Sequence, residues 1–162
     1  FEKDFNGFET VGKAYDFIHL CCEACGVECA HTQEEIEAIA EDESYIDLYG
    51  RLEDRFGDNG VVSVVIGHQS GRQVDIDLWI MSCRVLKRDL EYAMMDRFME
   101  ICKNRGVEKI VGHYYPTAKN AMVKEFYALH GFSKTQEDAN GNTRWEIDAD
   151  QYVPGNKVIE LC

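Results

Sequence analysis

The sequence predicts an α+β domain in which helices flank one mixed central sheet. A chain of 162 residues suits a single domain with its own core. An apolar share of 45% and an aromatic share of 11% supply that core and exclude intrinsic disorder. The spacing of apolar residues changes between helical and alternating along the chain, in the order helices, three strands, helix, strand, helix, hairpin.

Two helices are expected at the start. Residues 11–25 carry an apolar stripe at helical spacing, and Gly26 supplies a stop. Thr32 followed by Glu35 has the spacing of a capping box, so a second, short helix begins there.

Three strands follow and predict an antiparallel meander. They are expected at residues 45–52, 61–66 and 74–80. The first two are separated by a turn at residues 58–60, Asp-Asn-Gly. Asp75 and Asp77 alternate with the apolar residues of the third strand, so we expect them on a solvated face.

The second half of the chain predicts helices and strands in alternation. They are a long helix at 88–105, a strand at 107–114, a helix at 118–130 and a hairpin at 132–136 and 143–147. Because a helical crossover allows the next strand to run parallel, the strand at 107–114 is the expected parallel partner in the sheet.

Charge and composition exclude several classes of function. The 30 acidic and 17 basic residues give a formal charge of −13, which disfavours binding to nucleic acid or to an anionic membrane. No apolar run approaches the ~20 residues of a membrane span. The seven cysteines are odd in number and scattered, which predicts reduced thiols and a cytoplasmic location. The start at Phe1 favours a processed chain or a segment of a longer one.

The junction between the third strand and the long helix is a candidate anion site. Arg84, Lys87 and Arg88 place three positive charges there. A helix N-terminus adds backbone amides and a positive dipole end, which favour phosphate. The alternative is that these three side chains are simply solvated.

Several motifs in this chain resemble the C-terminal region of FkbH-type proteins, which pair a HAD phosphatase-like domain with a domain similar to GNAT acyltransferases. They are Asp54-Arg55-Phe56-Gly57-Asp58-Asn59-Gly60, Met81-Ser82-Cys83-Arg84-Val85-Leu86, Pro116-Thr117-Ala118-Lys119-Asn120, and Phe126-Tyr127 with Gly131-Phe132. The resemblance implies a GNAT-like domain at residues 31–150, after a helical segment at 1–30 that resembles nothing we recognise and before a tail at 151–162.

The resemblance also implies a function. An acyl group of glyceryl type would move to or from the pantetheine thiol of coenzyme A (CoA) or of an acyl carrier protein. A HAD phosphatase-like domain, on the same chain or another, would be a further partner. The alternative is a catalytically silent module that docks a carrier protein or that phosphatase domain.

GNAT proteins hold the cofactor pyrophosphate on a loop of pattern Gln/Arg-x-x-Gly-x-Gly/Ala. The cofactor-binding candidates implied here are Arg84, Val85, Leu86, Lys87 and Arg88, with Asn120 for the pantetheine arm. Lys87 and Asp89 occupy the two glycine positions. Side chains at these positions keep backbone amides away from a phosphate, and Asp89 adds negative charge beside the pyrophosphate of CoA. A carrier-bound phosphopantetheine has one phosphodiester instead of a pyrophosphate, so it becomes a more attractive ligand than CoA.

Three residues are candidates for catalysis, each with a structural alternative. By the resemblance, Tyr127 is the general acid that protonates the departing thiolate, or else a buried aromatic residue. His113 is a candidate general base, or else a strand histidine satisfied by a neighbour. Cys83 could carry the acyl group as a thioester if Arg84 and the helix dipole lowered its pKa, or else fills a strand end. Asn120 could equally be a helix cap.

One cysteine cluster invites a metal site. Cys22, Cys25, Cys29 and His31 form a C-x-x-C-x-x-x-C-x-H run of soft ligands. Structural zinc sites draw ligand pairs from separated segments, and helical spacing places these cysteines on one stripe. The sequence therefore favours core thiols and no metal.

Overall fold

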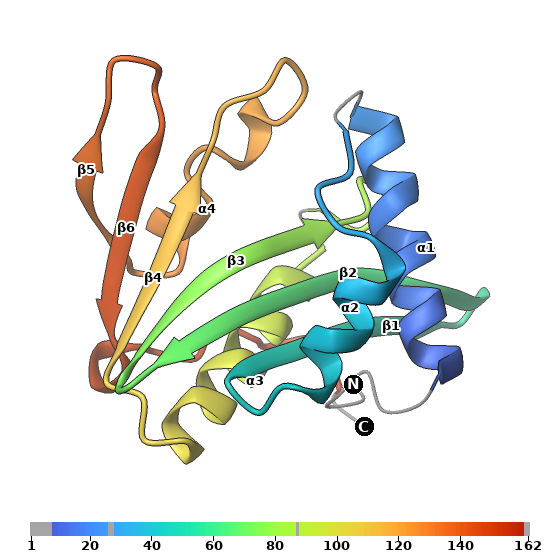
Figure 1. The fold of residues 1–162 in the computed structure, drawn as a ribbon, viewed down its shortest axis with the longest axis horizontal. Coiled ribbons are helices and arrows are strands. Elements are labelled where there is room, and N and C mark those ends of the chain that lie inside the picture. Colours follow the sequence, from blue (N-terminus) through green and yellow to red (C-terminus); the bar gives the residue numbers. More distant parts are fainter. Residues whose placement is uncertain (1–7, 26–27, 87, 161–162) are drawn as a thin grey trace.

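The computed structural model describes residues 8–25, 28–86 and 88–160, and its centre is one mixed sheet of six strands (Figure 1). The strands are β1 (Tyr45–Asp54), β2 (Gly57–Ser70), β3 (Gln73–Met81), β4 (Lys109–Tyr114), β5 (Ser133–Glu137) and β6 (Thr143–Asp148), in the order β1-β2-β3-β4-β6-β5. The helices are α1 (Phe8–Cys25), α2 (Gln33–Glu41), α3 (Leu90–Asn104) and α4 (Phe126–Leu129), with 3-10 turns η1 (Ala121–Val123) and η2 (Ala149–Gln151). No helix in these ranges has the length and apolarity to cross a bilayer.

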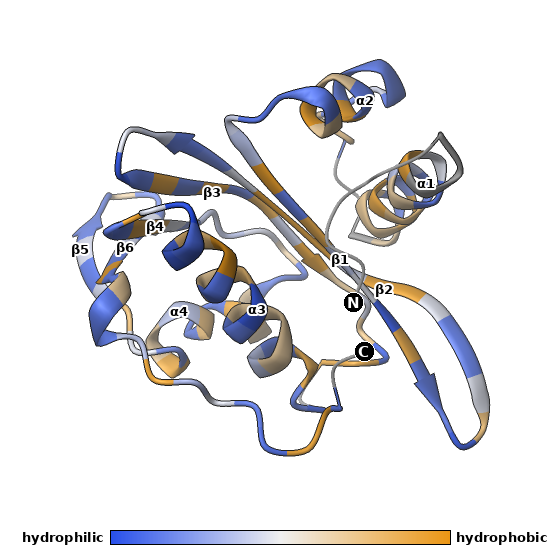
Figure 2. Cartoon of the chain, turned by 90° about the horizontal axis from the view of Figure 1, so that it is seen from below, coloured by the Kyte–Doolittle hydropathy of each residue, from blue (hydrophilic) through white to orange (hydrophobic). Residues whose placement is uncertain are grey.

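The sheet lies between two helical layers (Figure 2). Helices α1 and α2 cover one face, and α3 and α4 cover the other. The apolar stripe predicted for α1 is confirmed, since Val11, Ala14 and Ile18 are all buried. The capping box is confirmed too: the Glu35 amide donates to Thr32 Oγ1 at 3.2 Å, and the Thr32 amide donates to Glu35 Oε2 at 2.9 Å.

The core on the α3 side is built around Phe98, which is fully buried. Its ring lies over Gly67 of β2, where an added Cβ would approach the ring to 2.8 Å. A residue without a side chain is therefore needed at position 67 for α3 to approach the sheet so closely.

The first hairpin turns earlier than the sequence predicts. The turn consists of Arg55 and Phe56 rather than residues 58–60, which belong to β2. Asp54 Oδ1 accepts the Phe56 amide at 2.8 Å, and Gly57 adopts φ +131°. A side-chain cap and one glycine thus close the turn before the Asp-Asn-Gly sequence is reached.

The single helix expected at 118–130 is wrong. The structure has only η1 and the one-turn helix α4 there. Two apolar residues of the supposed helical stripe, Met122 and Leu129, are exposed. Asn120 explains the break, because its side chain accepts the Thr117 amide at 2.7 Å and donates to the Tyr115 carbonyl at 2.8 Å, which fixes an irregular loop.

Strands β3 and β4 are parallel, as predicted, but they pair at only three positions. The pairs are Gln73 with Lys109, Val74 with Ile110 and Asp75 with Val111. Beyond them the two strands diverge (Figure 1), so their facing edges leave backbone N–H and C=O groups free of strand partners.

A bulge in β3 coincides with this divergence. Gly67 of β2 pairs with Ile76 and Ile66 pairs with Leu78, so Asp77 is an extra residue without a partner in β2. The bulge also shifts the alternation of β3. Ile76 lies in the core on the α3 side, whereas Leu78 packs towards α1 and α2.

Candidate functional site

A cavity of about 660 Å³ occupies the opening between β3 and β4. The side near α3 and α4 is largely apolar and is lined by Trp79, Met81, Leu86, Val123, Phe126 and Tyr127. The opposite side is polar and is lined by His68, Asp75, Asp77 and His113, with Tyr115 beside them. The cavity therefore joins an apolar half to a half rich in titratable groups.

His113 and Asp75 form a pair across the opening. His113 Nε2 lies 3.4 Å from Asp75 Oδ1, and both side chains are partly exposed. Gln73 Nε2 donates to the other carboxylate oxygen of Asp75 at 3.0 Å. Both oxygens of Asp75 are thus engaged, and the carboxylate orients the imidazole ring of His113.

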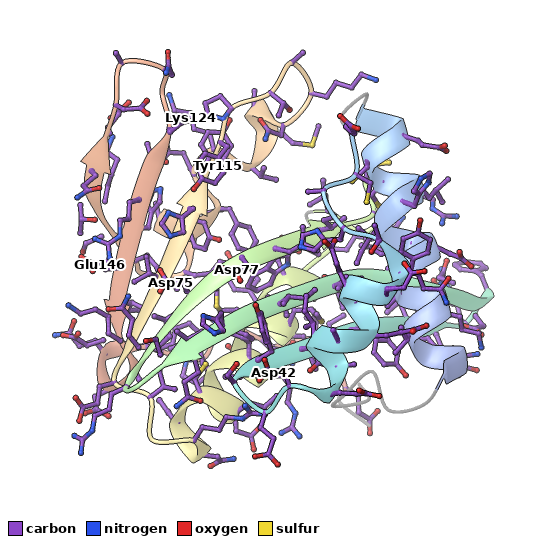
Figure 3. The ribbon with its side chains drawn as sticks, in the orientation of Figure 1. Asp42, Asp75, Asp77, Tyr115, Lys124 and Glu146 are labelled. Carbon is purple, nitrogen blue, oxygen red and sulfur yellow. The ribbon has the colours of Figure 1, made fainter. Side chains whose placement is uncertain are left out.

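Asp75 is partly exposed and Asp77 is exposed, as strand alternation predicts, but their solvated face also borders the cavity, which the sequence did not predict. Figure 3 shows both on β3 where it leaves β4, and both line the cavity. Partial burial raises the pKa of Asp77, an effect that Asp75 reinforces and that His68 opposes. The signal missed in the sequence was the bulge, which strand alternation alone does not reveal.

Tyr127 lies in the wall of the cavity with its ring on β4. A Cβ added to Gly112 would approach that ring to 2.3 Å, so the Tyr127 ring can pack this closely on β4 only because residue 112 is a glycine. Burial raises the pKa of Tyr127 strongly, and a hydrogen bond with the backbone of His113 acts the other way. The phenol therefore keeps its proton, as a hydrogen-bond donor to a thiolate must.

The predicted anion loop leads from β3 into α3. Arg84 and Arg88 are exposed, and Arg84 donates through its amide and its Nε to Ser82 Oγ, both at 3.4 Å. Val85 is buried in the core, so its side chain is a packing residue, whereas Leu86 lines the cavity. The predicted contribution of Lys87 lies outside the described residues.

Asp89 has a backbone conformation that favours glycine. Its φ is +65°, a left-handed value that no other described residue except glycine adopts. It precedes α3 without making a side-chain cap hydrogen bond. The loop thus keeps a turn suited to glycine while carrying a carboxylate in that position.

The remaining candidates lie at the edge of the site. Cys83 is exposed on the turn after β3 and does not line the cavity. Asn120 accepts from Tyr114 Oη at 3.2 Å and holds the loop after β4, so it acts on the cavity by positioning that loop. Its predicted contact with a pantetheine arm remains a prediction.

The cysteine run does not gather as a metal site in the part of the chain described. No three side chains among His, Cys, Asp and Glu converge there on a common point. Cys29 Sγ instead donates to the His31 carbonyl at 3.5 Å. The side chain of Cys25 lies outside the described residues.

The architecture matches many solved acetyltransferase structures. An aminoglycoside 6'-N-acetyltransferase complexed with coenzyme A has a TM-score of 0.69 and 13% identity, over 97% of this chain and 98% of that chain. The ribosomal-protein-S18-alanine N-acetyltransferase from Escherichia coli has a TM-score of 0.64 and 12% identity, over 96% of each chain. The chain has the GNAT fold.

A third match is an acetyltransferase of the GNAT family from Staphylococcus aureus, with a TM-score of 0.68 and 10% identity over 88% of this chain and 95% of that chain. The sequence itself matches no protein-family model and no curated protein. The fold predicted from the resemblance is thus confirmed, and the GNAT likeness at these identities concerns the fold alone.

We expect one buried histidine to make the stability of this domain depend on pH. His130, which follows α4, packs against Phe126 and Tyr92, and neither of its ring nitrogens has a hydrogen-bond partner among the described residues. Burial lowers the pKa of His130 from 6.5 to about 4. Between these values the unfolded chain takes up a proton that the folded chain refuses, so stability falls as the pH drops from 6.5 to about 4.

We therefore expect His130→Phe to remove a destabilisation of roughly 3 kcal/mol at pH 4 and much less at pH 7.5. Urea unfolding at both pH values measures it. His19→Gln is the control, because His19 is exposed on α1. Equal gains for His130→Phe at both pH values would show that His130 does not cause the effect.

Proposed function

We propose that this protein is an acyltransferase whose donor is a pantetheine thioester of CoA or of a carrier protein. The observation that carries the proposal is the cavity between the diverging edges of β3 and β4, with the His113–Asp75 pair on one side and Tyr127 on the other. The GNAT fold supports it, since a solved structure with this fold is complexed with coenzyme A.

The cavity suits a pantetheine arm. The unpaired edges of β3 and β4 offer backbone donors and acceptors to the two amides of such an arm. Trp79, Met81 and Phe126 offer apolar contact to its methylene groups. Arg84 and Arg88 lie on the loop that follows β3, where they would bind the phosphate end.

Proton transfer would use the His113–Asp75 pair. With Asp75 accepting from Nε2–H, His113 presents Nδ1 as the basic nitrogen, and it would take the proton of an attacking acceptor. The bound thioester supplies the acyl group. On the opposite side, the protonated Tyr127 phenol would donate a hydrogen bond to the sulfur as it departs.

Position 89 provides a test of cofactor binding. We expect Asp89→Gly to tighten CoA binding by about tenfold, because it removes a negative charge beside the pyrophosphate and suits the left-handed backbone. Asp89→Asn should recover part of that gain, since asparagine removes the charge alone. Arg84→Glu should weaken binding.

Isothermal titration with CoA measures all three variants, and exchange of isotope-labelled acyl-CoA measures turnover. Absence of CoA binding together with absence of label exchange, with both CoA and acyl carrier protein as donors, would overturn the enzyme proposal. If Asp89→Gly bound CoA with unchanged affinity, the phosphate would not bind at this loop.

The resemblance to FkbH-type proteins supports a finer, second proposal. Here the acyl group is of glyceryl type, the pantetheine belongs to an acyl carrier protein, and a HAD phosphatase-like domain is a partner. Carrier proteins are acidic, so docking would use the exposed Arg84 and Arg88 against the overall charge of −13. Carrier affinity that is unchanged after charge reversal at both arginines would count against docking through this face. Docking without acyl exchange would identify a catalytically silent module.

A further inference from the structure

After β6 the chain runs along α3 as an irregular segment that one carboxylate holds in place. We call residues 152–159 the C-terminal strap (Figure 1). Asp96 Oδ1 accepts hydrogen bonds from Tyr152 Oη and from the Gly155 amide, the latter at 2.9 Å. Asp96 Oδ2 accepts the Asn156 amide, also at 2.9 Å. Hydrogen bonds to a carboxylate are stronger than those between neutral groups, so the strap is firmly attached to α3.

The strap lies on the ring of Tyr92, one turn before Asp96 on α3. A Cβ added to Gly155 would approach that ring to 2.4 Å, so backbone and ring are in direct contact. The Tyr92 ring centroid lies 4.9 Å from that of His130, which lies 4.7 Å from that of Phe126. His130 is 6% exposed, and neither of its ring nitrogens has a hydrogen-bond partner among the described residues. Packing against these two rings therefore holds it.

This series of ring contacts ends in the wall of the cavity. Phe126 lines the cavity, and its ring meets those of Trp79 and Tyr127 edge-on, at 4.8 and 5.4 Å. The helix that carries Phe126, α4, has only four residues, and its N-cap residue Glu125 makes no side-chain cap hydrogen bond. Because a single helical turn is not stable by itself, the position of Phe126 depends on the side chains packed against it.

We propose that the C-terminal strap positions the apolar wall of the cavity, with Asp96 and Gly155 as positioning residues. The described residues lining the cavity include none from the strap, so it acts through Tyr92 and His130 on Phe126. The consequence for donor binding rests on the proposed function. A strap that is released from α3 would let the packed rings shift, and the wall would lose the shape that accepts a pantetheine arm.

The first test needs no ligand. The full chain labelled with fluorotryptophan gives one fluorine NMR resonance for each of its two tryptophans, and Trp145→Phe identifies that of Trp79 by elimination. We expect Asp96→Asn and Gly155→Ala each to shift the Trp79 resonance. The first variant weakens the attachment of the strap, and the second forces the strap away from Tyr92.

Two control variants should leave the Trp79 resonance in place. Glu100→Gln also exchanges a carboxylate for an amide on α3, but Glu100 is exposed and pairs with Arg97. Thr32→Ala removes the capping box of α2, on the other face of the sheet, and so lowers stability without touching the strap.

Replacing the middle ring tests the route from strap to wall. In a His130→Ala background, the shift caused by Gly155→Ala should largely disappear. In a His130→Phe background it should persist, because a ring still lies between Tyr92 and Phe126. A shift that survives unchanged in His130→Ala, or the absence of a shift in both strap variants, would overturn the inference.

The second test is isothermal titration with CoA at a temperature where thermal unfolding shows every variant folded. We expect Asp96→Asn and Gly155→Ala to weaken CoA binding by about three- to tenfold, and the two control variants to leave it unchanged. Equal weakening in Thr32→Ala would assign the effect to lost stability and refute positioning.

The two proposals fail in different ways. If the wild-type protein binds neither CoA nor a carrier, the proposed function fails, while the fluorine resonances still decide whether the strap positions the wall. If the strap variants shift the Trp79 resonance but bind CoA as tightly as the wild type, the strap has no part in donor binding and the proposed function stands.

Discussion

His113→Gln is expected to slow acyl transfer by about a hundred- to ten-thousand-fold while leaving the fold intact. Glutamine preserves a polar side chain opposite Asp75 but has no basic nitrogen. Position 113 can then no longer take the proton from the attacking nucleophile. The ring of His113 is partly exposed, which limits the stability cost of replacing it. Steady-state rates and thermal unfolding of the same samples separate the two effects.

A second variant separates the roles of the two members of the pair. Asp75→Asn should lower the rate less, because it removes the group that orients the ring rather than the base itself. His68→Gln is the matched control, since His68 lines the same cavity but packs on Tyr45. A rate loss in His68→Gln equal to that in His113→Gln would indicate a general loss of cavity shape.

Gly112→Ala is expected to destabilise the protein by about 3 kcal/mol, at the upper end of the usual cost of overpacking. The new Cβ would approach three ring atoms of Tyr127 to 2.3, 2.4 and 2.6 Å, far inside contact distance. Tyr127 is buried, and its ring also contacts Phe126 and Phe132, so it has little room to move aside. Urea unfolding measures the loss.

A double variant distinguishes this clash from other causes. Tyr127→Leu in the Gly112→Ala background should cost less than Tyr127→Leu alone, because the smaller side chain makes room for the methyl group. Gly12→Ala is the control, since no atom lies within 4 Å of its added Cβ and alanine favours the helix. Additive effects of Gly112→Ala and Tyr127→Leu would contradict the packing given above.

Periodicity predicted the fold well because it reports burial on one face of an element. The stripe of α1 follows from it, whereas the capping box of α2 follows from the Thr32–Glu35 spacing and the parallel pairing of β4 from the helical crossover before it. It failed where a single side chain or one extra residue decides the geometry. Asn120 breaks the expected helix, and Asp54 closes the first turn early.

The candidate site was only partly predictable for the same reason. His113, Tyr127 and Leu86 were singled out from the sequence, and the structure brings all three to one cavity. Strand alternation placed Asp75 and Asp77 in solvent, to which both are accessible. It could not reveal the bulge or a neighbour that approaches from a strand far along the chain, so their position beside the cavity was missed. Their part in the cavity depends on how β3 leaves β4, and that follows from packing across the whole sheet.

The attachment of Tyr127 to β4 has a mechanical consequence. Its ring rests on Gly112 and its phenol is hydrogen-bonded to the backbone of His113, so the expected acid and base are held by consecutive residues of one strand. Asp75 and Asp77 belong to the opposing strand. If β3 and β4 moved further apart, His113 and Tyr127 would move together with β4. The 3.4 Å contact between His113 and Asp75 would then lengthen. A ligand that drew β3 and β4 together would thus shorten the contact between His113 and Asp75, while the distance between His113 and Tyr127 stays constant.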